Sequence, residues 1–130
     1  MTDYEAIRDL VERYKKAIHT QNKEDFISLW TGEESNTLIS IANPFRGITS
    51  IYEDFLIGGI QTLYQQIDII GESFEVNFLD QQTAIVIFRY HTECIRRGSG
   101  EPHGIAGIET QVVVKRGEKW KLAHVHYSKK

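Results

Sequence analysis

The sequence predicts an α+β fold in which N-terminal helices pack on a long, curved antiparallel sheet. In the first half of the chain, apolar residues recur at the i, i+3, i+4 spacing of amphipathic helices. From about residue 66 onward, the apolar pattern becomes strand-like, and turn-forming residues separate the successive runs. Short turns between such runs are typical of consecutive hairpins, so antiparallel pairing is expected.

Three helices are expected before the main sheet. The first spans residues 3–20 and has Thr2 or Asp3 at its start. Asn22 caps a short second helix over residues 23–30, and residues 37–42 form a strand that Asn43-Pro44 stops. The third helix covers about residues 50–63, and Gly58-Gly59 predicts a weak point in its middle.

The main sheet is expected to contain four long runs, over residues 67–78, 83–95, 104–115 and 119–127. Strands of this length coil strongly as they twist. The segments 85–88 and 112–114 are apolar on both faces, so both faces of the sheet need cover. The helices supply cover for one face, and a homodimer through the other face is the simplest further prediction.

Composition restricts the class of protein. The chain has 130 residues and a net charge of -3, which predicts a single domain over residues 1–130 and argues against nucleic-acid binding. Cys94 is the only cysteine, so an intramolecular disulfide is excluded. The start of the chain is acidic and no long apolar run is present, so we expect a cytoplasmic protein without membrane contact.

The C-terminal half contains motifs that point to a known family. These are Glu109-Thr110 followed by Val112, Lys115-Arg116-Gly117, Trp120, and His124-Val125-His126-Tyr127-Ser128, together with Asn43-Pro44 through Gly47 before the third helix. With this order of helices and hairpins, the chain resembles the nuclear transport factor 2-like superfamily. It looks most like the SnoaL-like branch and is similar also to the association domain of calcium/calmodulin-dependent kinase II. The resemblance implies a cystatin-like α+β roll, a cone with a pocket at its wide end, and dimers through the outer face of the sheet.

Acidic residues are the first candidates for chemistry. The resemblance implies a buried carboxyl as base, and the steroid isomerases of the superfamily carry it in or near the early strand. Residues 36–50 contain no acidic residue, which counts against isomerase-type chemistry. Glu109 lies in a long strand, where it is either a pocket acid or an outward glutamate paired with Arg89.

Histidines are expected to be structural or to form hydrogen bonds in the pocket, and the cysteine is expected to be structural. His124 and His126 share one strand face, and His91 or His103 could add a third metal ligand. No acidic ligand stands at matching spacing, so neither a metal nor another cofactor is predicted. Nothing marks a base beside Cys94, which is expected to pack as a small apolar residue.

Aromatic and neutral polar residues are the candidates for a ligand pocket. The positions that align with pocket arginines of the kinase association domain are Tyr90, Gln111 and Tyr127, so the resemblance implies an uncharged or weakly polar ligand. Apolar walls with a few hydroxyl or amide groups are typical of small-molecule sites. The predicted ligand-binding set is Tyr14, Trp30, Phe55, Tyr90, Gln111, His126 and Tyr127, and Phe45 and Tyr64 belong to the same aromatic group.

Two functional hypotheses follow. The first is a small-molecule-binding SnoaL-like protein with isomerase-, cyclase- or lyase-type acid–base chemistry; whether it is an enzyme stays open. The second is a non-catalytic homo-oligomerisation module that resembles the kinase association domain.

Overall fold

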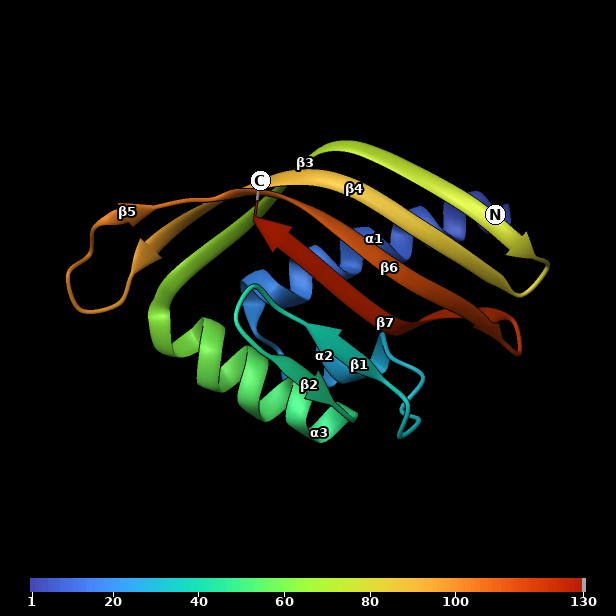
Figure 1. Cartoon of the computed structure of the whole chain (residues 1–130), viewed down its shortest axis with the longest axis horizontal. Helices are drawn as coiled ribbons and strands as arrows, with labels where there is room; N and C mark the ends of the chain where they lie inside the picture. Colours follow the sequence, from blue (N-terminus) through green and yellow to red (C-terminus); the bar gives the residue numbers. More distant parts are fainter. Residues whose placement is uncertain (130) are drawn as a thin grey trace.

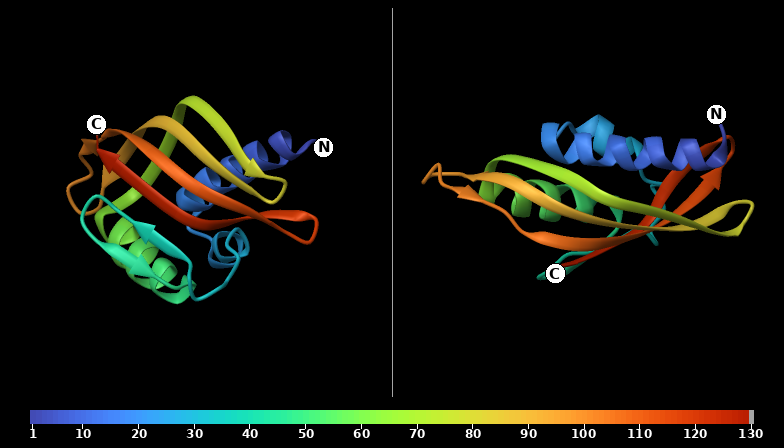
Figure 2. Two further views of the ribbon diagram at one scale, coloured as in Figure 1. Left: turned by 45° about the vertical axis from the view of Figure 1, so that its right-hand side comes forward. Right: turned by 90° about the horizontal axis from the view of Figure 1, so that it is seen from above.

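The computed structural model describes residues 1–129, in which helices pack on one strongly curled mixed sheet (Figure 1). The strand order is β2-β1-β7-β6-β4-β3, and β5 pairs with β4 outside this path. Helix α1 runs along one face of the sheet, as the view from above shows (Figure 2). The α+β cone predicted from the sequence is therefore present.

The first two helices begin at the predicted residues because their caps are encoded locally. Helix α1, Asp3–Thr20, has Thr2 as N-cap, and Thr2 and Glu5 form a reciprocal capping box. It ends where Gln21 adopts a left-handed conformation with φ 59°. Helix α2, Lys23–Ser28, begins after Asn22, whose side chain accepts a hydrogen bond from the Asp25 amide at 3.0 Å.

The third helix continues through the two glycines where a weak point was expected. A short turn, α3 (Ile48–Ser50), leads into a π-helix, η1 (Ile51–Gln61). The wider π-helical turn leaves room at Gly59, where an added Cβ would meet only the Asp54 carbonyl oxygen, at 3.7 Å. The helix is therefore of the π type over this stretch and is not interrupted at the glycines.

The sheet is built from four long strands, β3 (Tyr64–Asp80), β4 (Thr83–Arg96), β6 (Ala106–Arg116) and β7 (Lys119–Lys129), all paired antiparallel. Irregular registers between Gly71 and Ser73 on β3, and between Val112 and Val113 on β6, help the strands to bend. The two-residue β5 (Pro102–His103) extends the far end of β4.

Two short strands make the sheet mixed. β1 (Thr37–Ile39) pairs parallel with β7, and β2 (Pro44–Arg46) pairs antiparallel with β1. The expectation of a strand over 37–42 stopped by Asn43-Pro44 was therefore wrong in part, because residues 40–43 form the turn of a hairpin. Parallel pairing of β1 with a strand more than eighty residues away is a long-range feature that local pattern does not reveal.

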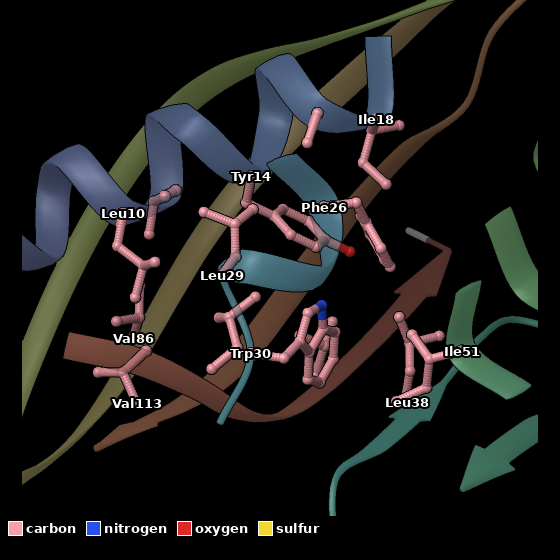
Figure 3. Packing of buried hydrophobic residues seen from close by; sticks show 14 of the residues in the cluster. Leu10, Tyr14, Ile18, Phe26, Leu29, Trp30, Leu38, Ile51, Val86 and Val113 are labelled. Atoms are coloured by element: carbon pink, nitrogen blue, oxygen red, sulfur yellow. The ribbon is translucent and has the colours of Figure 1, made fainter. Parts of the chain in front are cut away.

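The hydrophobic core fills the space between α1, α2 and the concave face of the sheet. Figure 3 shows Leu10, Tyr14 and Ile18 of α1 directed toward α2 and the strands. Tyr14, Phe26 and Trp30 form a continuous aromatic group, with ring centroids 6.1–6.3 Å apart along the series. No helix among residues 1–129 is long and apolar enough to cross a membrane.

Candidate functional site

A cavity of about 430 Å³ lies between the concave face of the sheet and helix η1. Its walls come from the C-terminal half of α1, the β1–β2 turn, η1 and the inner faces of β3, β4, β6 and β7. Exposed Ile41 and Leu63 belong to this lining. A mainly apolar, concave space of this size accommodates a small organic molecule.

Aromatic side chains make up much of the cavity wall. The lining includes Tyr14, Phe45, Phe55, Tyr64, Tyr90 and Tyr127. Phe55 links two parts of the wall, since its ring centroid lies 5.8 Å from that of Phe45 and 6.1 Å from that of Tyr127. Strand and helix periodicity together aim these rings inward, because Tyr90 and Tyr127 lie on the inner faces of β4 and β7.

Helix η1 presents backbone as well as side chains to the cavity. Gly58 and Gly59 both line it, so the backbone of the helix forms part of the wall. The end of this helix is held from the opposite side by Arg97, whose Nε donates to the Gln61 carbonyl oxygen at 2.8 Å and whose Nη2 donates to that of Tyr64 at 3.0 Å. These hydrogen bonds satisfy carbonyls at the exit from the helix and tie η1 to the far end of β4.

Glu109 is the one carboxyl in the cavity wall that is buried. Its residue is 3% exposed, and its Oε2 accepts a hydrogen bond from Gln111 Nε2 at 2.7 Å. Burial raises the pKa of Glu109 to about 8, while the hydrogen bond from Gln111 and the charge of Lys15 act in the opposite direction. The side chain is therefore mostly a neutral acid at pH 7.

Three tyrosines surround this acid. Burial raises the pKa of Tyr14, of Tyr90 and of Tyr127 above the ordinary value, and the nearby Glu109 carboxyl acts in the same direction on each. The hydroxyls consequently stay protonated and can donate hydrogen bonds. The arrangement offers neutral hydrogen-bond donors at one end of an apolar space.

The structure places four of the seven predicted ligand-binding residues in the cavity wall: Tyr14, Phe55, Tyr90 and Tyr127. The other three lie elsewhere. Trp30 packs in the aromatic core beside Phe26, and Gln111 is fully buried behind Glu109. His126 is exposed, because strand alternation directs Val125 and Tyr127 inward and His126 outward.

The histidine pair lies on the outer face of the sheet. His124 Nδ1 is 2.6 Å from Thr37 Oγ1 on β1, and burial lowers the pKa of His124. The two rings are 6.4 Å apart. In the described part of the chain, no group of three or more His, Cys, Asp or Glu side chains is arranged to hold a metal ion.

Cys94 and Trp120 take structural positions. Cys94 is buried and lines the cavity, where burial raises the pKa of its thiol. Trp120 Nε1 donates to Asp3 Oδ1 at 3.0 Å, which ties the last strand to the start of α1. A thiol with a raised pKa is a poor nucleophile, in keeping with the expected packing role.

The sequence left two alternatives for Glu109, a pocket acid or an outward glutamate paired with Arg89, and the structure shows which environment it has. Arg89, the alternative partner, is exposed on the outer face of β4, whereas Glu109 points inward beside Phe88 in the register of the two strands. Strand periodicity alone identifies two faces without saying which one is covered. No local signal in the sequence therefore distinguishes the two environments of this carboxyl.

Similarity to known proteins covers almost the whole chain. The family model described as SnoaL-like domain matches residues 1–126. No curated protein is significantly similar to the chain in sequence.

Solved structures share the fold at low sequence identity. A nuclear transport factor 2-like superfamily protein from Salmonella enterica serovar Typhimurium LT2 superposes with a TM-score of 0.90 at 22% identity, covering 95% of this chain and 87% of its own. The LinA-type3 hexachlorocyclohexane dehydrochlorinase from Novosphingobium barchaimii LL02 superposes with a TM-score of 0.85 at 13% identity, covering 97% of this chain and 85% of its own. A candidate scytalone dehydratase from Novosphingobium aromaticivorans DSM 12444 superposes with a TM-score of 0.85 at 17% identity, covering 98% of this chain and 84% of its own.

Proposed function

The chain belongs to the SnoaL-like domain family, and we propose that it binds a small, uncharged, largely apolar molecule in the cavity and carries out acid–base chemistry on it through Glu109. The observation that carries this proposal is a carboxyl 3% exposed in the wall of a mainly apolar cavity of about 430 Å³. Such a group is costly to bury, which makes it a candidate functional group.

The charge of the lining supports an uncharged ligand. The described residues that line the cavity include no Lys, Arg or His, and the acidic ones are Asp54 and Glu109. Asp54 is exposed and accepts a hydrogen bond from Ser50 Oγ at 2.8 Å. A carboxylate or phosphate ligand would find no cationic partner here, and its burial without one would be strongly unfavourable.

The protonation state of Glu109 suits proton transfer. A pKa of about 8 leaves both the acid and the carboxylate populated near neutral pH. Neutral Tyr14, Tyr90 and Tyr127 hydroxyls can hold an oxygen of the ligand while Glu109 gives or takes a proton. Two structural neighbours carry the names of elimination enzymes, a dehydrochlorinase and a dehydratase. We therefore propose lyase-type chemistry as the specific reaction class.

A neutral fluorescent probe tests the cavity directly. N-phenyl-1-naphthylamine should bind the wild-type protein with increased fluorescence, because its size and polarity match the cavity. Gly59→Leu, which enlarges a residue of the cavity wall where an added Cβ meets only ordinary contact with the Asp54 carbonyl oxygen at 3.7 Å, should weaken binding at least tenfold. The control Leu79→Ser removes an apolar side chain that is 62% exposed outside the cavity and should leave binding unchanged. The proposal would be contradicted if Gly59→Leu still bound the probe and Leu79→Ser no longer did.

Self-association is a second proposal, and one observation favours it. The face of the sheet opposite the cavity carries Ile85, Ile87, Ile108 and Val112, all of them partly exposed along β4 and β6. A second copy of the chain that covers this face would give a homodimer and leave the cavity open. The alternative function, a non-catalytic assembly module, would be favoured if native mass spectrometry found a ligand-free ring of many subunits.

A further inference from the structure

Gln111 is an unusual residue for its place in the fold. It is fully buried on the inner face of β6, and its register partners on the neighbouring strands are Val86 and Val125, both also fully buried. A long amide side chain in such surroundings costs free energy unless both of its polar atoms find partners. An aliphatic side chain would fill the position at lower cost.

Only half of this amide is satisfied by protein. Gln111 Nε2 donates to Glu109 Oε2 at 2.7 Å, whereas Gln111 Oε1 is buried without a hydrogen-bond partner among residues 1–129. The two residues are two positions apart on one strand, so their side chains point the same way and the contact is built into β6. The polar side chain at position 111 therefore serves Glu109 rather than the stability of the core.

The direction of this hydrogen bond determines how Glu109 faces a ligand. With the amide donating to Oε2, the other oxygen, Oε1, is free to carry the proton of the neutral acid. After ionisation, the same N–H stabilises the carboxylate by a charge-assisted hydrogen bond. One contact thus orients the acid and favours its conjugate base.

We propose that Gln111 is a positioning residue: its amide holds Glu109 Oε2, leaves Oε1 available to the ligand and stabilises the ionised carboxylate by a charge-assisted hydrogen bond. This inference rests on the proposed function, because it concerns the acid–base group of the same cavity.

Other ionisable groups around Glu109 are common to all the variants compared below. Tyr14 and Lys15 approach it from α1, Tyr90 from β4 and Tyr127 from β7. Cys94 of β4 and Asp54 of η1 lie further along the same cavity wall. A change at position 111 alters none of these groups, so a change in the titration of Glu109 reports the amide itself.

The test is a pH titration of the Glu109 side-chain carboxyl by carbon-13 NMR, with the signal assigned by its loss in Glu109→Gln. In Gln111→Leu the midpoint should move upward by about one pH unit, because a hydrogen bond to the carboxylate is lost. The melting temperature is not the readout of this test, since the leucine removes the unpaired amide oxygen but also leaves Glu109 Oε2 without its donor. Gln111→Met serves as a second variant of similar shape.

The matched control is Val86→Ala, which disturbs the same layer of the core without adding a polar group beside the amide. It should lower the melting temperature and leave the Glu109 midpoint unchanged. An unchanged or lowered midpoint in both Gln111 variants would overturn the inference, and so would an equal upward shift in Val86→Ala. The titration needs no ligand, so failure of the probe to bind the wild-type protein would count against the proposed function alone.

Discussion

Replacing Glu109 with glutamine removes a buried ionisable group while keeping the shape of the side chain and its contact with Gln111. In the wild-type protein, burial raises the pKa of Glu109 from its ordinary 4.5 to about 8. The folded state therefore keeps a proton that the unfolded chain releases above about pH 4.5. Because the native state binds more protons than the unfolded state in this window, wild-type stability falls as pH rises from about 4.5 to about 8.

The size of this effect follows from the two pKa values. Their difference, about 8 minus 4.5 or about 3.5, corresponds to about 5 kcal/mol at about 1.4 kcal/mol per unit when the whole window is crossed. Most of this change, roughly 3 to 4 kcal/mol, falls between pH 5 and pH 8 by the linkage relation. The Glu109→Gln variant lacks this contribution, so its stability should decline much less over the same range.

Urea unfolding at pH 5, 6, 7 and 8 measures the difference, with fluorescence of the two tryptophans as the signal. Other titrating groups, such as His91 and His124, are present in both proteins and cancel in the comparison. The control Glu118→Gln changes an exposed glutamate in the turn between β6 and β7 and should follow the wild-type profile. Parallel profiles for wild type and Glu109→Gln would show that Glu109 is not held as a neutral acid, and the reasoning would fail.

Two further substitutions test the geometry of the fold. Gly107→Ala should lower the melting temperature by several degrees and displace Tyr90, because an added Cβ would lie 2.5 Å from the Ser128 carbonyl oxygen and 2.7 Å from the Tyr90 hydroxyl. Thermal unfolding measures the loss of stability, and probe binding measures the change in the cavity. An unchanged melting temperature and unchanged binding would contradict the close approach of the Gly107 backbone to these two groups. Ile87→Asp places a charge in the partly exposed apolar face of β4 and should convert a dimer to monomers, as measured by analytical ultracentrifugation. The control Glu93→Gln should leave the dimer intact. A monomeric wild-type protein would refute the proposed self-interface.

Much of the secondary structure could be predicted from the sequence, because its signals are local. Thr2 and Asn22 cap the first two helices through hydrogen bonds to amides three residues away. Turns separate the long strands, and alternation correctly assigns Phe88 and Tyr90 to one face of β4 and Arg89 to the other. The aromatic members of the candidate site follow from the same alternation and from the family resemblance.

Other features depend on contacts between distant segments. The parallel pairing of β1 with β7 joins Leu38 to Val125, and the irregular register at Val112 and Val113 changes which residues of β6 and β7 share a face. Trp30 and His126 are of residue types expected in a pocket. Trp30 nevertheless lies in the core, and His126 lies on the outer face of the sheet.

The sequence by itself determined the helices, the four long strands and the family of this protein, since caps, turns and periodicity act over a few residues. Only the tertiary structure decided the environment of Glu109. Period-two alternation divides a strand into two faces, but the position of α1 and η1 decides which face is removed from water. Burial is what turns an ordinary glutamate into a neutral acid beside Gln111, and burial is a property of the assembled chain.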